Sequence, residues 1–298
     1  MNNQGFQAHA ALFLVATLYG INYSIVKLVT PEYILPFGFI GIRIFLGTLI
    51  FGLLAIGNGD GIKWRQDGWR LILCGITGVG INMLLFFKGI SLTSATNGSL
   101  IMTLIPLFVF AFSILILKEK IVTLRLVGLI IGLLGAAAII WQPTHSLSGN
   151  PIGDLMIVGN ALSYSLYLVL VRPLMDHYKL LTVTKWVFLI GLIFSIPFSL
   201  KEVLIADYGS FTSTVWWSIL FVVIGVTVVV YFLNIYAMKK SSPTLVAAYA
   251  YLQPVVAILT ASLFFDEQLA IIHFIGGALI FTGIYMVSRF RPKLTKAA

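Results

Sequence analysis

Apolar residues along this chain are collected into ten long runs, each separated from the next by a short polar gap. A helix needs about 20 consecutive apolar residues to cross the hydrocarbon core of a bilayer, and these runs approach or exceed that length. The connections are short and leave no room for a soluble domain. The pattern predicts ten membrane-spanning helices, near residues 9–29, 36–56, 69–90, 96–118, 123–141, 152–172, 183–200, 214–237, 243–265 and 269–288.

One part of this pattern occurs twice. Moving residues 94–141 forward by 148 positions, without a gap, places a proline, an acid and two glycines on residues of the same type. A shared apolar composition does not account for these identities at one offset, so we interpret the chain as two copies of one helical unit. The identities are Pro106 with Pro254, Glu119 with Glu267, Gly128 with Gly276 and Gly135 with Gly283.

Each copy contains five helices, an odd number, so the second copy must cross the bilayer in the opposite direction to the first. The predicted fold is therefore an all-α integral membrane protein of two inverted five-helix repeats, at residues 1–145 and 146–298. Such a repeat can expose one midplane site to either side in turn, when its two halves exchange conformations.

The repeated prolines and acids are predicted to have structural or gating roles. A proline inside a span removes a backbone donor, which is tolerated where a neighbour or a polar cavity satisfies the freed carbonyl. The glycines Gly128, Gly132 and Gly135 share one helix face and would let another helix approach closely. Ordinary kinks and packing explain these residues about as well as a direct functional role. The structural or gating residues are Pro106, Glu119, Pro254 and Glu267.

Composition agrees with a membrane location. Hydrophobic residues make up 59% of the 298 residues and charged residues only 10%, whereas a soluble domain has about a quarter charged residues. The lone cysteine, Cys74, cannot form an intramolecular disulfide. The first apolar run is too long for the core of a signal peptide, and no Lys or Arg precedes it, so we expect it to remain as a spanning helix.

Loop charge predicts the orientation. With the N-terminus inside, 15 of the 19 Lys and Arg residues fall in inner segments, so both termini are predicted to be cytoplasmic. The net charge of +9 then follows from topology. The basic tail at 289–296 is interpreted as an anchor to the lipid surface, and no nucleic acid is expected as a partner.

The two units resemble the EamA-type members of the drug/metabolite transporter superfamily. Toward its end, each unit has a proline and, thirteen residues later, an acid. A last helix follows, with two glycines at matching positions. An aromatic residue before Gly20 in the first helix and Arg43 early in the second are also similar to the family, although its usual first-helix tryptophan is Tyr19 here. The resemblance covers nearly the whole chain.

The resemblance implies a ten-helix bundle around a central cavity, in the inner membrane, that moves small metabolites and often exports them. Because the family commonly carries amino acids, we expect an amino-acid exporter or facilitator that works by alternating access, with aromatic amino acids as one candidate class. A carrier of other small polar solutes, such as sugars, nucleosides or drugs, and a non-transporting membrane scaffold are the alternatives. The expected oligomeric state is a monomer or a homodimer.

Polar and aromatic side chains deep in the spans are the candidates for substrate binding. Buried amides and phenols require hydrogen-bond partners. Two pairs, Asn82 with Phe86 and Tyr249 with Gln253, share a helix face at a spacing of four. Such pairs combine ring stacking with hydrogen bonding around one small ligand, although each residue could equally bond a neighbouring helix. The predicted substrate-binding residues are Asn22, Asn82, Phe86, Thr103, Tyr167, Tyr249, Gln253 and Arg43.

Arg43 is the one charge well inside a span, about 12 Å past the start of its helix. A charge at this depth usually faces a wet cavity or a partner. Arg43 could bind a substrate carboxylate through two hydrogen bonds, or it could bind freed carbonyls in a structural or gating role. The second interpretation is favoured because the family has arginine here for varied substrates.

The remaining titratable residues do not predict a coupling ion or an enzyme. All ten acids and the four histidines, His9, His145, His177 and His273, lie in loops or near span ends. Proton relays normally use such groups in the membrane interior, so we expect facilitated or weakly coupled transport. There is no zinc-protease motif, phosphate-binding glycine loop or pair of intramembrane aspartates. Enzymatic activity, a metal and a cofactor are not expected.

Overall fold

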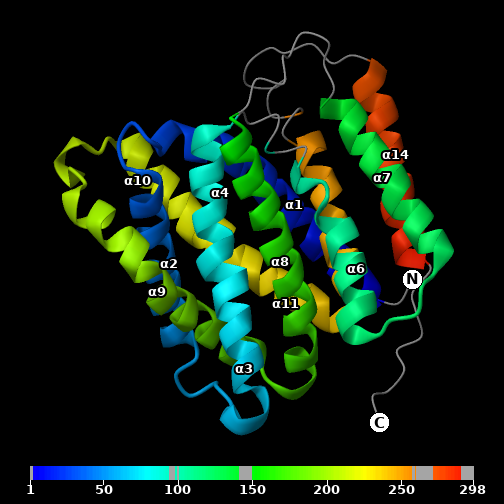
Figure 1. Cartoon of the computed structure of the whole chain (residues 1–298), viewed down its shortest axis with the longest axis horizontal. Helices are drawn as coiled ribbons and strands as arrows, with labels where there is room; N and C mark the ends of the chain where they lie inside the picture. Colours follow the sequence, from blue (N-terminus) through cyan, green and yellow to red (C-terminus); the bar gives the residue numbers. More distant parts are fainter. Residues whose placement is uncertain are drawn as a thin grey trace.

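The computed structural model describes residues 3–93, 98, 101–140, 150–256, 259 and 271–289. These residues form one bundle of long helices that run side by side (Figure 1). The segments are α1 (Asn3–Val29), α2 (Pro36–Leu54), α3 (Trp64–Gly75), the π-helix η1 (Ile76–Gly80), α4 (Ile81–Leu92), α6 (Ile105–Leu117), α7 (Thr123–Ile140), α8 (Pro151–His177), α9 (Leu180–Ile205), the 3-10 helix η2 (Tyr208–Ser210), α10 (Ser213–Leu220), the π-helix η3 (Phe221–Val229), α11 (Val230–Lys240), α12 (Pro243–Ala248), the 3-10 helix η4 (Tyr249–Tyr251) and α14 (Ile271–Arg289).

The predicted all-α membrane fold is confirmed. Each of the ten predicted runs contains helix among its described residues. In length and composition, five continuous helices can cross a membrane: Pro36–Leu54, Trp64–Leu92, Pro151–His177, Leu180–Ile205 and Ser213–Lys240. Shorter apolar helices lie at Ile105–Leu117, Thr123–Ala138 and Phe274–Arg289.

The third and eighth spans are each interrupted by a π-helix. Shifting η1 forward by the repeat offset of 148 residues places it within η3, so both copies widen at the same place. Single π-helical turns inside α-helices occur frequently at functional sites, because the wider turn alters which backbone groups are available. Both segments contact side chains of the cavity described below.

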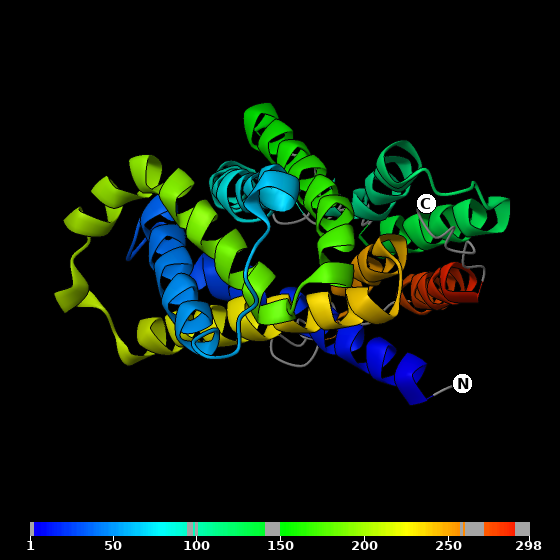
Figure 2. The same ribbon diagram turned by 90° about the horizontal axis from the view of Figure 1, so that it is seen from below.

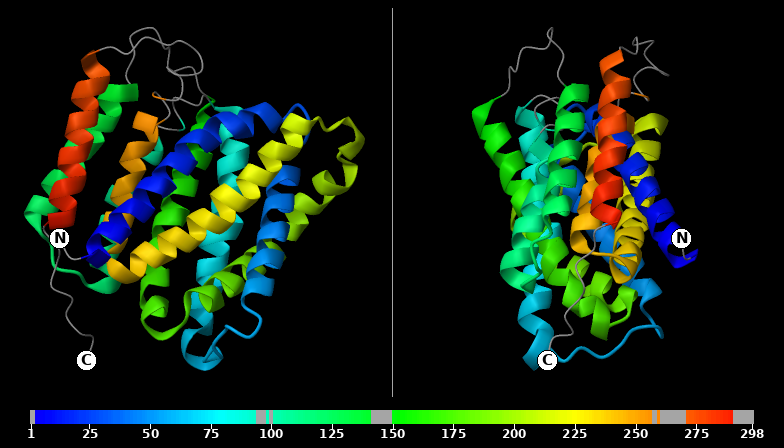
Figure 3. Two further views of the ribbon diagram at one scale, coloured as in Figure 1. Left: turned by 180° about the vertical axis from the view of Figure 1, so that it is seen from behind. Right: turned by 90° about the vertical axis from the view of Figure 1, so that its right-hand side faces the viewer.

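The last helices of the two repeats cross through their glycines. A Cβ atom on Gly135 would lie 2.6 Å from the carbonyl oxygen of Gly276, and one on Gly128 would lie 3.0 Å from that of Gly283. Residue numbers rise along α7 while they fall along α14, so the two helices pair in opposite directions, as an inverted repeat requires. The predicted close approach at these glycines is confirmed, and α7 and α14 lie side by side in both views of Figure 3.

The two ends of the bundle are formed by different connections. We call one the basic end; it contains the α2–α3, α6–α7, α8–α9 and α11–α12 connections, at the bottom of Figure 1. Seen from this end, α7 and α14 lie at one side of the bundle and α9 and α10 at the other (Figure 2). These connections, together with the helix ends beside them, carry most of the basic residues counted above.

Polar contacts join the connections at the basic end. Tyr178, which follows α8, donates a hydrogen bond from its hydroxyl to Asp67 Oδ2 at 2.8 Å. The ammonium group of Lys239 donates to the Tyr178 carbonyl at 3.2 Å. Lys179 contacts Asp60 through both its backbone N–H, at 2.7 Å, and its ammonium group, at 3.2 Å. The α2–α3 loop is therefore fastened to the α8–α9 turn.

We expect the Asp60→Asn substitution to lower the thermal stability slightly at neutral pH. The hydrogen bond from the Lys179 backbone holds the pKa of Asp60 below its ordinary value, which is about 3.9 in an unfolded chain. A carboxyl whose pKa is lower in the folded state than in the unfolded state stabilises the fold at any pH above its unfolded-state pKa. This stabilisation is lost as the pH falls through its folded-state pKa. Melting curves in detergent from pH 7 to pH 3 should therefore converge for the wild type and the variant. A difference that keeps its full size at pH 3 would contradict this assignment.

Candidate functional site

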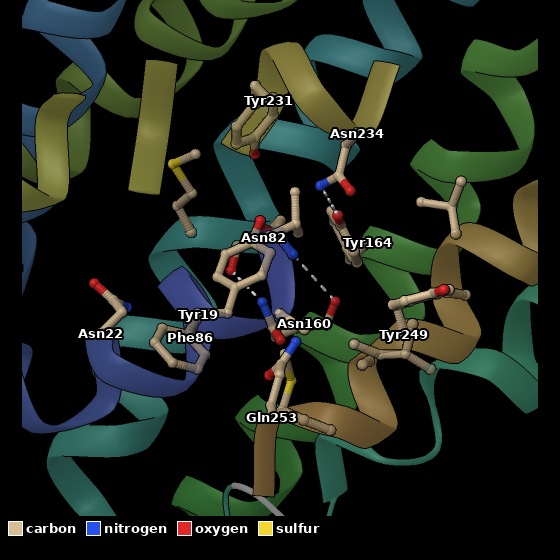
Figure 4. Close-up of a pocket in the computed structure, with 18 of the residues that line it drawn as sticks. Tyr19, Asn22, Asn82, Phe86, Asn160, Tyr164, Tyr231, Asn234, Tyr249 and Gln253 are labelled. Atoms are coloured by element: carbon tan, nitrogen blue, oxygen red, sulfur yellow. Dashed lines mark hydrogen bonds between the residues drawn. The ribbon is translucent and has the colours of Figure 1, made fainter. Parts of the chain in front are cut away.

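A cavity of about 760 Å³ lies between the two repeats. Helices α1, α2, α4, α6, α8, α11 and α12 line it, with η4 and the residues that follow (Figure 4). Its apolar wall includes Met83, Phe86, Phe87 and Met102. Its polar lining consists of Tyr19, Asn22, Arg43, Asn82, Asn160, Tyr164, Tyr231, Asn234, Tyr249 and Gln253.

Six of the eight predicted binding residues line this cavity, but the other two do not. The ring of Tyr167 packs on Gly78, where an added Cβ atom would lie 2.4 Å from a ring carbon. Tyr167 also stacks against Tyr164 and Tyr231, with ring centroids 5.9 and 6.2 Å away, so it supports two cavity residues from behind. Thr103 is buried outside the lining. A binding role for these two residues stays a prediction.

The predicted structural and gating residues occupy several environments. Pro106 lies in the first turn of α6 next to Ile105, which lines the cavity. Pro254 is buried directly after Gln253. Glu119 forms an ion pair at the basic end, whereas Glu267 lies outside the described residues. Their gating roles stay predictions.

Arg43 is held in place by η3. Its Nε donates to Thr227 Oγ1 at 2.6 Å, and its Nη2 donates to the Val226 carbonyl at 3.2 Å. The guanidinium lies 6.0 Å from the centroid of the Phe87 ring. Although Arg43 is only 5% exposed, it is part of the cavity wall. Arg43 therefore binds one hydroxyl oxygen and one backbone carbonyl and also lines the cavity. Its predicted roles, in substrate binding or in structure and gating, stay predictions.

Two asparagines connect α4 with α8. Asn160 Nδ2 donates to the Asn82 carbonyl at 2.7 Å, and Asn82 Nδ2 lies 3.5 Å from the Asn160 carbonyl. The first contact fixes the orientation of the Asn160 side-chain amide. In Figure 4 this amide points toward the side-chain amide of Gln253. Among the described residues, neither Asn160 Oδ1 nor Asn22 Oδ1 has a hydrogen-bond partner. Unsatisfied buried acceptors are costly, so they favour a ligand that supplies N–H or O–H donors.

The opposite part of the cavity is built from phenols and one more amide. Asn234 Nδ2 donates to the Tyr164 hydroxyl at 3.1 Å (Figure 4). The Tyr231 hydroxyl donates to the Gly78 carbonyl, in η1, at 2.7 Å. These contacts orient side chains from α8 and α11 around the cavity. Both π-helices therefore orient side chains of the cavity wall, since η1 accepts a hydrogen bond from Tyr231 and η3 accepts hydrogen bonds from Arg43.

Five residues of the polar lining were not among the predicted binding residues. Asn160 lies in the middle of the apolar run 152–172, so the rule that selected Asn22 and Asn82 would also have selected it. Tyr19 was noted only as part of the family resemblance. For the tyrosines, no signal in the sequence separates a ring that faces the cavity from one that packs behind it. The five are Tyr19, Asn160, Tyr164, Tyr231 and Asn234.

One histidine contacts the cavity wall. His9 Nδ1 lies 2.5 Å from the hydroxyl of Tyr249, and its Nε2 lies 3.3 Å from Ser288 Oγ. Sequence position alone put His9 near the end of the first span. The structure shows that it joins α1 to η4 and α14 and touches a cavity residue. A titratable group therefore lies closer to the candidate site than the sequence predicted.

Comparisons with known proteins identify a family and several relatives. The model of the EamA-like transporter family matches residues 7–141 and again residues 151–289. The uncharacterized transporter YetK of Bacillus subtilis is 25% identical over 98% of this chain and 90% of its own length. An uncharacterized transporter of Archaeoglobus fulgidus is 26% identical, over 94% of this chain and 98% of that protein. Protein PecM of Dickeya dadantii is 26% identical, over 74% of this chain and 73% of that protein.

A solved crystal structure of a protein also matches the fold. It superimposes with a TM-score of 0.75 over 96% of both chains, at 18% sequence identity. At this level of identity the likeness concerns the fold alone.

Proposed function

This chain belongs to the EamA-like transporter family, and we propose that it carries amino acids through the cavity by alternating access. Membership makes it a small-molecule transporter of the membrane. The proposal goes beyond family membership in naming amino acids as the substrate, and one observation is its main support. The cavity combines a fixed guanidinium, amide and phenol groups and an aromatic wall within about 760 Å³.

Each part of an amino acid has a matching group in this lining. The carboxylate matches Arg43, because guanidinium groups bind carboxylates through paired hydrogen bonds. The ammonium group matches amide oxygens such as that of Asn160, which has no partner among the described residues. An apolar or aromatic side chain matches the surface of Phe86, Phe87 and Met83.

The inverted repeats supply the mechanism of this proposal. When the halves exchange conformations, a site between them opens to one side and then to the other. The loop charge favours the cytoplasm for the basic end and for both termini. No acid lies at membrane depth in the sequence, which favours a facilitator. The contact between His9 and Tyr249 is the place where proton dependence would originate.

Flux into liposomes that contain only the purified protein tests the proposal. We expect saturable uptake and counterflow of at least one of the aromatic, small neutral or hydroxylated amino acids, without a need for a proton gradient. Gln253→Leu and Asn82→Leu should each lower this flux by about 10-fold or more, because each removes a buried polar contact. Asn58→Leu, in the exposed α2–α3 loop, is the control and should leave flux unchanged.

Other outcomes identify the alternatives. Flux of sugars or nucleosides with none of the amino acids would replace the proposed substrate class. Full flux in both cavity variants would place the transport path elsewhere. If no solute crosses faster than in protein-free liposomes, the scaffold alternative is favoured.

A further inference from the structure

Among the residues that the structure describes, no carboxylate pairs with the charge of Arg43. Every Asp and Glu of the sequence lies in a loop or at a span end, and none lines the cavity. Among the described residues of the lining, the other titratable groups are the phenols of Tyr19, Tyr164, Tyr231 and Tyr249. The other elements packed around it present Thr227, the Val226 carbonyl and the Phe87 ring. All of these groups are neutral.

A second deeply buried arginine, Arg125, has a different environment. Arg125 is paired with Glu119 at 3.0 Å, and the two side chains are 1% and 8% exposed. Buried charges in proteins are usually paired in this way, because removal of an ion from water costs several kcal/mol that a counter-charge must offset. Two hydrogen bonds to neutral oxygens offset only part of this cost for Arg43. Its burial in the cavity wall therefore favours an anion from outside the protein as its partner.

The geometry leaves Arg43 ready to bind that anion. An arginine has five N–H donors in a planar fork. Contacts to η3 engage Nε and Nη2, whereas Nη1 has no hydrogen-bond partner among the residues that the structure describes. The contacts also hold the guanidinium plane in one orientation before a ligand arrives, which reduces the entropy lost on binding.

A positive group on the ligand finds a weaker match. The cavity offers it only amide oxygens, phenols and ring faces. A contact between two ions at low dielectric is stronger than one between an ion and a neutral amide. A second negative charge would also lack a partner, since Arg43 is the one cation among the described residues of the lining.

We infer that the carboxylate of the substrate is the counter-ion of Arg43, so the site selects monocarboxylates and the amino group is dispensable for binding. This inference rests on the proposed function in taking the cavity as the transport site. It extends the ligand class from amino acids to organic acids of the same shape. It also makes the corresponding amines and dicarboxylates poor ligands.

Binding of matched compounds to the purified full-length protein, measured by calorimetry, tests the inference. One set is phenylalanine, 3-phenylpropionate, phenethylamine and phenylsuccinate; the other is leucine, 4-methylpentanoate and isopentylamine. We expect the two monocarboxylates of at least one set to bind within about 10-fold of each other. The amine of that set, and phenylsuccinate in the aromatic set, should bind about 100-fold more weakly, the size of a lost charged hydrogen bond.

Variants at Arg43 separate binding from a structural role. Arg43→Gln should weaken the monocarboxylates by about 100-fold, leave the amine unchanged and keep the wild-type melting temperature. Arg43→Lys should retain part of the preference, because it keeps the charge without the planar fork. If Arg43→Gln does not fold, Thr227→Val is the second variant, and it should weaken only the carboxylates.

Three results would overturn the inference: an amine that binds as tightly as its matching acid, equal weakening of all compounds by Arg43→Gln, or no binding of any carboxylate. Failure of the proposed function is a separate result. Carboxylate-selective binding that depends on Arg43, without flux of any amino acid, supports the anion site and contradicts amino-acid transport.

Discussion

Replacement of Arg125 by alanine is expected to lower the free energy of unfolding by about 3–5 kcal/mol, because it leaves the Glu119 carboxylate buried without its partner. Arg125 Nη1 donates to Glu119 Oε2 at 3.0 Å, and Nη2 donates to Ser242 Oγ at 2.8 Å. Ser242 is the N-cap of α12. The side chain therefore connects the last two helices of the first repeat to the fourth helix of the second.

Apparent melting temperatures in detergent measure this effect, and the chain offers a matched control. Asp176→Asn removes an ion pair of similar length, 2.7 Å, whose carboxylate is 59% exposed, and it should cost less than about 1 kcal/mol. The double variant Arg125→Met with Glu119→Leu should be more stable than Arg125→Ala, since no unpaired charge remains buried. Equal effects of Arg125→Ala and Asp176→Asn would show that the buried pair does not stabilise the fold.

The same pair bears on the gating role predicted for Glu119. Arg125 of this pair also donates to Ser242 of the second repeat at the basic end, where the halves must change their contacts if the protein alternates between two states. A contact that exists in only one state shifts the balance between the states by its own free energy. Glu119→Gln, which keeps the side-chain shape, should then change the rate of flux more than the affinity for substrate.

The fold could be predicted from the sequence because its signals are local or periodic. A span requires only a run of apolar residues, and the repeat needs only one offset to align Gly128 with Gly276. The site was predicted less completely. Which face of a helix lines a cavity depends on neighbours that are distant in sequence, so Tyr167 and Tyr164 could not be separated, although only Tyr164 lines it.

The environment of Arg43 shows the same limit. Its depth in the span was predictable, but its partner Thr227 is 184 positions away and lies in a π-helix that no pattern in the sequence indicated. His9 was set aside because it is near a helix end, yet it contacts Tyr249 across 240 positions. Such contacts depend on how the two repeats pack against each other, and hydrophobic periodicity does not predict that packing.

The second large expected effect is a loss of stability when a side chain is added where α7 and α14 cross. A Cβ atom on Gly283 would lie 2.5 Å from the Gly128 carbonyl oxygen and 2.7 Å from the Gly132 backbone nitrogen. Both neighbours are backbone atoms and cannot rotate away, so the helices would have to separate. We expect Gly283→Ala to cost about 3 kcal/mol, at the upper end for overpacked sites, and to lower the apparent melting temperature accordingly.

Gly277, on the same helix, provides the matched control, since a Cβ atom there has no neighbour within 4 Å among the described residues. Gly277→Ala should be neutral or slightly stabilising, because alanine is favoured over glycine in a helix by about 1 kcal/mol. The two variants share the same chemical change and the same helix and differ only in what the methyl group meets. If both melt at the wild-type temperature, close contact at the glycines is not what holds the repeats together, and the apolar side chains that flank the crossing must supply the stability.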